Sequence, residues 1–153
     1  MTAFEAARYL LRNGHQVQGV LLIDSPSPLN HIQLSEDLID CVVDSDRGHR
    51  VCSEARQLVK SQFKMNSHAL ANYNPHTHKG SFPSLALLRS SEGFHHPDIK
   101  DIPAWLSDRS NPDQVVLDWE KLVGTTVKVW KMPGHHFRPF DDVNVSLLAS
   151  YLL

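Results

Sequence analysis

Cysteine is scarce in this chain, and so is any excess of charge of one sign. Two cysteines, Cys41 and Cys52, among 153 residues offer neither a disulfide framework nor a metal-ligand spacing. We therefore expect free thiols in a reducing cytoplasm. Fifteen Lys and Arg against 17 Asp and Glu leave a net charge of -2, with no basic stripe. Nucleic acid and anionic membranes are therefore not expected as partners.

Long apolar runs are absent as well. The run at 20–23 has four residues, whereas a helix that spans a bilayer needs about 20. The segment 4–12 is amphipathic and carries Glu5, Arg8 and Arg12, unlike a secretory signal. A chain of 153 residues is long enough for one hydrophobic core rather than two. We expect a single cytoplasmic domain that lies neither in nor on a membrane.

Helix-like and strand-like segments alternate along the chain, which predicts an α/β fold. Apolar residues at helical spacing cover 2–13, with Thr2 and Glu5 as a capping box and Gly14 as a left-handed stop. A buried strand is predicted at 17–23, because its second half is continuously apolar.

The rest of the chain predicts a helical insertion followed by two more strands. Residues 29–73 are helical in pattern, which indicates a lid placed between parallel strands. Strands are then predicted at 84–89 and 125–132, and helices at 112–122 and 142–153.

Two polar positions stand just past the ends of predicted strands. Asp24 ends the first strand, and His135 and His136 follow the last one after a Pro-Gly turn. In open parallel sheets functional groups gather beyond the carboxyl ends of the strands, and imidazole suits general-base chemistry near neutral pH. We predict that Asp24 orients His136 in a nucleophile–His–Asp relay. The alternative is that Asp24 caps the next element and both histidines are exposed loop residues.

The nucleophile of such a relay is not recognisable. A serine nucleophile sits on a strained strand-to-helix elbow, G-x-S-x-G, and no serine here has that setting. Ser25 and Ser27 lie among prolines, and Ser81 and Ser84 flank Pro83.

Ten histidines raise the alternative of a zinc site, because His-x-His is a known ligand spacing. No Cys or carboxylate stands at a suitable helical offset, and His-Glu-x-x-His is missing, so no metal is predicted. The three tryptophans lie on apolar faces and are interpreted as core. The paired histidines are His76 with His78, His95 with His96, and His135 with His136, and the tryptophans are Trp105, Trp119 and Trp130.

Several stretches together match a known kind of domain. They are Ala3-Phe4-Glu5-Ala6-Ala7-Arg8, Gly14, Val20-Leu21-Leu22-Ile23-Asp24-Ser25-Pro26, Gln62-Phe63-Lys64-Met65-Asn66, Tyr73-Asn74-Pro75, Leu87-Leu88-Arg89-Ser90 and Val129-Trp130 leading into Pro133-Gly134-His135-His136-Phe137. Over nearly all of its length the chain resembles the C-terminal thioesterase/Claisen-cyclase domains of fungal non-reducing polyketide synthases.

The resemblance implies a partial α/β-hydrolase fold, with about three mainly parallel strands, flanking helices and an inserted helical lid. It divides the chain into an elbow helix, strand and acid loop at 1–28, a lid at 29–80, and the last strands, His loop and final helix at 81–153. The family's acid matches Asp24, and its Gly-x-His-Phe histidine matches His136. Its serine would stand four positions before Met1, so the chain is expected to be the C-terminal part of a domain and inactive alone.

The resemblance also implies an activity and its partners. A polyketide acyl chain would arrive on the phosphopantetheine of an acyl carrier domain of the same synthase, and no cofactor would bind the chain directly. Release would follow by hydrolysis, lactonisation or Claisen cyclisation. Phe63, Met65, Tyr73 and His135 are the expected substrate contacts. The alternative is a non-catalytic domain that binds acyl chains or carriers.

Overall fold

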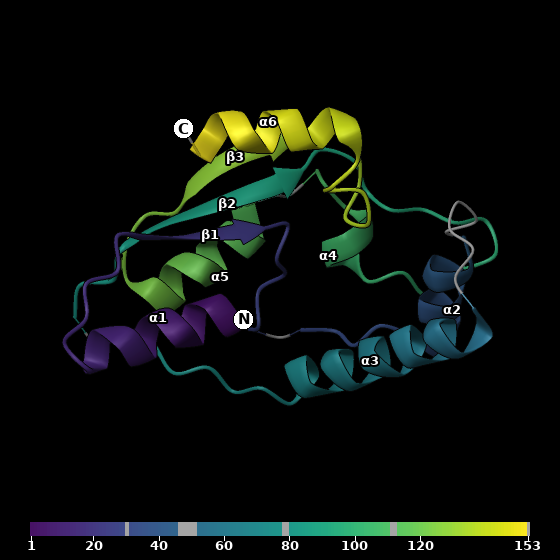
Figure 1. Cartoon of the computed structure of the whole chain (residues 1–153), viewed down its shortest axis with the longest axis horizontal. Helices are drawn as coiled ribbons and strands as arrows, with labels where there is room; N and C mark the ends of the chain where they lie inside the picture. Colours follow the sequence, from purple (N-terminus) through teal and green to yellow (C-terminus); the bar gives the residue numbers. More distant parts are fainter. Residues whose placement is uncertain (30, 46–51, 78–79, 111–112, 153) are drawn as a thin grey trace.

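A three-stranded parallel sheet forms the centre of the molecule in the computed structural model, which describes residues 1–29, 31–45, 52–77, 80–110 and 113–152. Its strands are β1 (Gly19–Ile23), β2 (Ser84–Ser90) and β3 (Lys128–Met132), in the order β1-β2-β3 (Figure 1). The central strand β2 is almost wholly buried, as a continuously apolar strand in a covered parallel sheet should be. The predicted α/β class and its parallel strands are confirmed.

Two of the strands are shorter than predicted. β1 begins at Gly19 rather than residue 17, and β3 begins at Lys128 rather than residue 125. Gly19 pairs with Ser84, the first residue of β2. The residue before Ser84 is Pro83, which has no N–H to donate to a ladder. The pairing of β1 with β2 therefore starts only after this proline.

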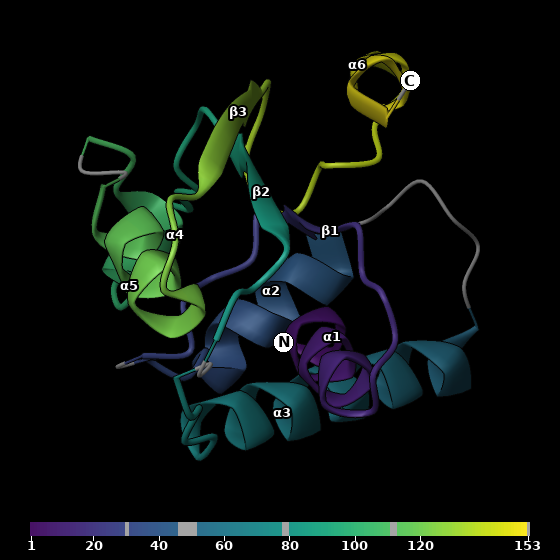
Figure 2. The same cartoon turned by 90° about the vertical axis from the view of Figure 1, so that its left-hand side faces the viewer.

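Helices cover both faces of the sheet. On one face, α1 (Thr2–Arg12) and α5 (Asp113–Val123) pack against the strands (Figures 1 and 2). Phe4 and Trp119, both fully buried, meet edge to face there with ring centroids 5.6 Å apart. On the other face, Leu148 of α6 (Asp142–Leu152) packs against Leu88 and Met132. The two faces together hold the strands, and so their carboxyl ends, in place.

The ends of α1 test two sequence predictions. The predicted capping box is wrong: Met1 is the N-cap without a side-chain bond, and Thr2 is already helical. The Glu5 side chain instead accepts a hydrogen bond from Arg8 at 2.7 Å. Gly14, at a φ of +77°, ends the helix with a Schellman pair of backbone bonds, as predicted.

Between β1 and β2 the chain forms a helical hairpin, α2 (Glu36–Ser45) and α3 (Ser53–Ala71), in the segment for which we predicted a lid. Ion pairs connect the two helices: Lys60 lies 3.2 Å from Asp40 and 3.0 Å from Asp44. Leu38 of α2 packs against Leu106 of the short helix α4 (Ala104–Ser107). The hairpin is thus anchored beside the segment that follows β2. In the part of the chain described, no helix is both long and apolar enough to cross a membrane.

Candidate active site

Asp24 lies immediately after β1 and is 4% exposed. Its φ of +40° is in the left-handed region, which Asp adopts more readily than most residues. Ser90, the last residue of the neighbouring strand β2, binds both carboxylate oxygens. Its N–H donates to Oδ1 at 2.9 Å and its hydroxyl donates to Oδ2 at 2.6 Å. Parallel strands end at the same edge, so this contact follows directly from the topology.

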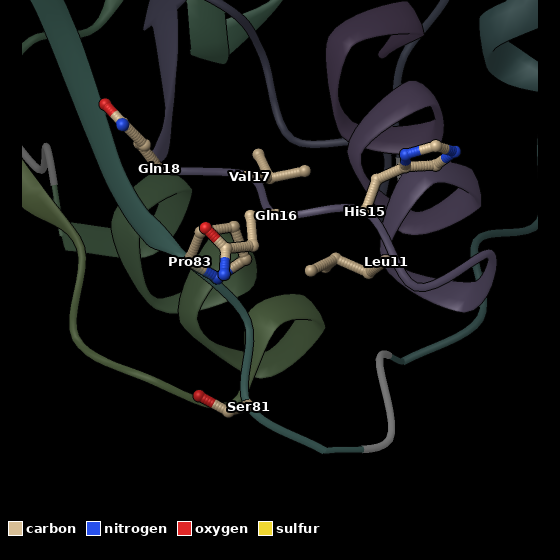
Figure 3. Close-up of a pocket in the computed structure, with 7 residues that line it drawn as sticks. All are labelled: Leu11, His15, Gln16, Val17, Gln18, Ser81 and Pro83. Carbon is tan, nitrogen blue, oxygen red and sulfur yellow. The ribbon is translucent and has the colours of Figure 1, made fainter.

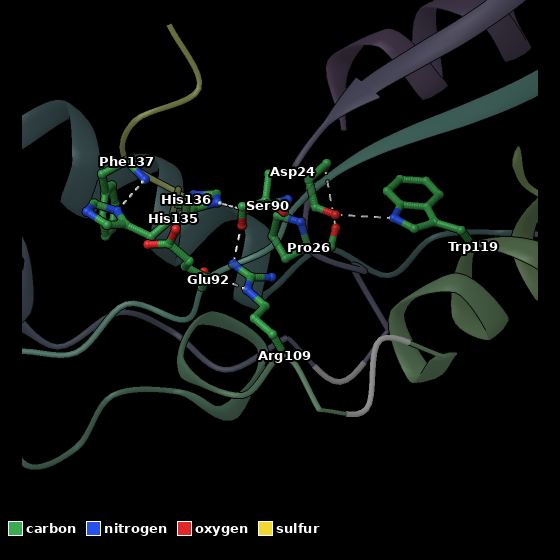
Figure 4. Close-up of polar contacts among 10 residues, drawn as sticks. Asp24, Pro26, Ser90, Glu92, Arg109, Trp119, His135, His136 and Phe137 are labelled. Atoms are coloured by element: carbon green, nitrogen blue, oxygen red, sulfur yellow. Dashed lines mark hydrogen bonds and ion pairs between the residues drawn. The ribbon is translucent and has the colours of Figure 1, made fainter. Parts of the chain in front are cut away.

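His136 reaches the same carboxylate from the loop after β3. Nδ1 of His136 lies 3.0 Å from Oδ2 of Asp24, across 112 residues of sequence (Figure 4). The loop turns at Gly134, which has a φ of +79°. It is held by the amide of Asn144, which donates to the carbonyl oxygens of Pro133 at 3.1 Å and Arg138 at 2.7 Å. The predicted pairing of Asp24 and His136 is therefore present in the structure.

The carboxylate of Asp24 also receives Nη2 of Arg109, 3.0 Å from Oδ2. Burial acts to raise the pKa of Asp24, but the hydrogen bonds from His136 and Ser90 and the charge of Arg109 outweigh it. They hold the pKa well below its usual range. An ionised carboxylate only accepts hydrogen bonds, so the neutral ring of His136 carries its proton on Nδ1.

That tautomer leaves Nε2 of His136 as an unprotonated base. Within the described residues, Nε2 has no hydrogen-bond donor or acceptor, and the side chain of His136 is 23% exposed. Two aromatic rings flank the imidazole edge to face, Phe137 at 5.0 Å and Trp105 at 5.3 Å between centroids. The arrangement can therefore remove a proton from a group that approaches Nε2 between aromatic walls.

No protein-family model matches the sequence. Segments of fungal synthases do match it over its whole length. It is 36% identical over 158 residues to the orsellinic acid synthase ArmB of Armillaria mellea, and 31% identical over 184 residues to an orsellinic acid synthase of Beauveria bassiana. The chain spans only 7% and 8% of those proteins. The chain is homologous to a segment of fungal polyketide synthases.

Solved structures of thioesterases have a fold similar to that of this chain. The thioesterase domain SrfTE, described for the cyclization of surfactin, matches 99% of this chain with a TM-score of 0.65 at 21% identity. The RedJ thioesterase of the prodiginine pathway in Streptomyces coelicolor matches 97% of it with a TM-score of 0.67 at 14% identity. The chain covers 62% and 57% of those two structures. Its fold is therefore that of α/β-hydrolase thioesterase domains, as the resemblance implied.

Within this thioesterase-like fold, the other predicted substrate contacts lie at different distances from the Asp24–His136 pair. His135 is next to it, edge to face with Phe94 at 5.3 Å. Burial, and then the charge of Arg138, lowers the pKa of His135.

The remaining three contacts predicted from the resemblance lie on the helical hairpin or just after it. Phe63 and Met65 are on α3, and Met65 is 60% exposed. The Tyr73 hydroxyl donates to Glu5 on α1. Burial and this bond raise the pKa of Tyr73 to about 12. Among the described residues, no hydrogen bond or ring contact links these three to the Asp24–His136 pair, so their substrate role stays a prediction.

Three residues of the site were not predicted as site residues from the sequence. Ser90 could have been, because it ends a strand beside the strand that ends at Asp24. Trp105, interpreted as core, does pack with the cluster around Leu106 and also flanks His136. Arg109 lies 85 residues from Asp24 in an irregular segment. No local pattern marks it.

Two further features lie apart from this site. A cavity of about 420 Å³ opens at the amino-terminal ends of β1 and β2, where Gln18 and Pro83 line it (Figure 3). Across the described ranges, no three His, Cys, Asp or Glu side chains could together hold a metal ion. Of the histidines considered as zinc ligands, His78 lies outside the described residues.

Proposed function

We propose that Asp24 and His136 form the acid–base part of an acyl-transfer site, which releases a polyketide chain from the phosphopantetheine of an acyl carrier domain. The 3.0 Å contact between Nδ1 and Oδ2 supports the proposal, because the buried, ionised carboxylate fixes the tautomer that makes Nε2 a base. Homology to the orsellinic acid synthases and the thioesterase fold support the choice of substrate class.

The proposed chemistry begins with a hydroxyl nucleophile. Nε2 of His136 takes its proton while the oxygen attacks the thioester carbonyl. The carbon–sulfur bond then breaks, and the imidazolium returns the proton to the departing phosphopantetheine thiolate. The acyl group remains as an oxygen ester. In the second half, Nε2 of His136 takes a proton from water, from a substrate hydroxyl or from the carbon acid that becomes the enolate, and this nucleophile attacks the ester carbonyl. The ester carbon–oxygen bond then breaks, and the imidazolium returns the proton to the departing oxygen. These three attacks correspond to hydrolysis, lactonisation and Claisen cyclisation.

The aromatic rings beside His136 affect the second half of the reaction, in which the acyl ester is attacked. Trp105 and Phe137 flank His136, and both pack with the hydrophobic cluster that includes Leu38 of α2. An apolar surrounding limits the access of water, which competes with an enolate for the acyl ester. We assign substrate contact to His135 beside the pair, and to Phe63, Met65 and Tyr73 as the acyl chain's farther contacts.

The experiment first asks whether a serine nucleophile is encoded upstream of Met1. The transcript upstream of the Met1 codon is read first. If an open frame encodes Gly-x-Ser-x-Gly there, the extended protein is expressed and incubated with a phosphopantetheinyl acyl thioester. We expect a serine-bound acyl group by mass spectrometry, and its loss in Asp24→Asn and His136→Ala. His15→Ala, an exposed histidine beside the distant cavity, is the matched control.

Two results would overturn the acyl-transfer proposal. One is serine acylation that is unchanged in His136→Ala. The other is thioester hydrolysis above background by the 153-residue chain alone, since we expect none without a serine elbow.

A second candidate is a non-catalytic domain that binds acyl chains or carriers. It is favoured by one observation: no hydroxyl or thiol among the described residues is hydrogen-bonded to Nε2 of His136. A stop codon directly upstream of Met1 would give this candidate the lead. It predicts that an acylated carrier domain binds the chain in calorimetry without turnover, and with the same affinity after His136→Ala.

A further inference from the structure

The guanidinium of Arg109 shares one oxygen of Asp24 with His136. Oδ2 receives Nη2 of Arg109 at 3.0 Å, Nδ1 of His136 at 3.0 Å and the Ser90 hydroxyl at 2.6 Å. The side chains of Asp24 and Arg109 are only 2% and 10% exposed. Water therefore screens their charges weakly, and the guanidinium offsets much of the carboxylate charge.

The backbone around Arg109 is built to hold it there. Its Nε donates to the carbonyl oxygen of Glu92 at 3.2 Å, so the guanidinium bridges the end of β2 and Asp24 (Figure 4). Next to Glu92, a Cβ placed on Gly93 would lie 1.8 Å from the carbonyl oxygen of Ser107. Only glycine permits this approach of the two segments. Arg109 thus reaches Asp24 from a fixed position rather than as a free surface side chain.

We propose that Arg109 is a positioning residue that acts on the acyl-transfer site through Asp24: held at Oδ2, its guanidinium offsets part of the negative charge that the imidazole of His136 faces. The purpose of this arrangement rests on the proposed function. When His136 accepts a proton, the resulting imidazolium faces the Arg109 cation as well as the carboxylate. Arg109 therefore weakens the hold of Asp24 on the imidazolium and favours transfer of the proton to the departing thiolate.

Three other charged side chains near the loop that carries His136 lie around its neighbour His135. They are Glu92, Arg138 and Asp141. The Arg138 side chain is 65% exposed and 3.8 Å from Asp141. Arg138 therefore offers a matched control, since it is an arginine of the same loop that does not touch Asp24.

The test is the proton NMR signal of the Nδ1–H of His136 in the 153-residue chain, identified by its loss in His136→Ala. Arg109→Met is expected to move this signal downfield, because the hydrogen bond to a less neutralised carboxylate strengthens. Arg109→Lys keeps a cation and is expected to stay near the wild-type position. Arg138→Met is expected to leave the signal unchanged.

Two outcomes would overturn the inference: a wild-type position in Arg109→Met, or equal shifts in the Met and Lys variants. Should Arg109→Met not fold, Arg109→Lys decides alone. A signal near the wild-type position then supports the inference, and loss of the signal in a natively folded Lys variant overturns the inference. No thioester is used in this measurement. A failure of the acyl-transfer proposal therefore leaves the result interpretable, and the two failures are distinguishable.

Discussion

Asp24→Asn is the substitution that tests the site most directly through stability. The side chain of Asp24 is 2% exposed and accepts four hydrogen bonds, two from Ser90 and one each from Arg109 and His136. An asparagine amide points a donor at one of these donors in either orientation. His136 can change tautomer, but the Arg109 cation cannot adapt. Since removing one partner of a buried ion pair costs about 3–5 kcal/mol, we expect a loss near the lower limit, about 3 kcal/mol.

Urea unfolding at pH 7, followed by tryptophan fluorescence, measures this loss from the shift in midpoint. Trp119 is fully buried in the core and should report unfolding. Asp118→Asn is the matched control, because the Asp118 side chain is only 9% exposed and bonds Gln114 and Lys121 within its own helix. It should cost less than about 1 kcal/mol. Equal midpoints for wild type and Asp24→Asn would refute the reasoning.

Three further predictions use the same assay. The folded pKa of Asp24 lies below its unfolded value of about 3.9, so its contribution to stability is complete above that pH and is lost as the pH falls toward the folded pKa. Asp24→Asn should therefore flatten the acid limb of the stability curve. Gly93→Ala should cost about 1–3 kcal/mol or more, because its Cβ would overlap the Ser107 carbonyl oxygen. Tyr73→Phe should cost about 1 kcal/mol through the lost bond to Glu5.

Each of these has its own check. An acid limb that is equally steep in Asp24→Asn would show that other carboxylates dominate it. Gly19→Ala is the milder glycine control, because its Cβ would lie 3.2 Å from the Ser84 carbonyl oxygen. If it costs as much as Gly93→Ala, the close approach is not the cause. Tyr151→Phe removes only an exposed 3.5 Å bond, so it should cost less than the Tyr73 change.

Patterns local in the sequence were enough for the order of the elements. The apolar run before Asp24 and the alternation of helices and strands predicted a parallel sheet, and the sheet is parallel. The boundaries were less well predicted, because a strand extends only as far as its neighbour can pair. The start of β1 depends on Pro83, more than 60 positions away in the chain. The capping box failed because Glu5 binds Arg8 and Tyr73 instead.

By itself, the sequence determined that Asp24 and His136 stand past strand ends, because strand periodicity and turn residues are local properties. Only the tertiary structure decided what else meets them. Ser90 and Arg109 lie 66 and 85 residues from Asp24, and they share its carboxylate only because the parallel strands end at one edge and Gly93 lets two backbones touch. The hydrogen bonds that keep the Asp24 carboxylate ionised therefore come from residues that only the folded chain brings together.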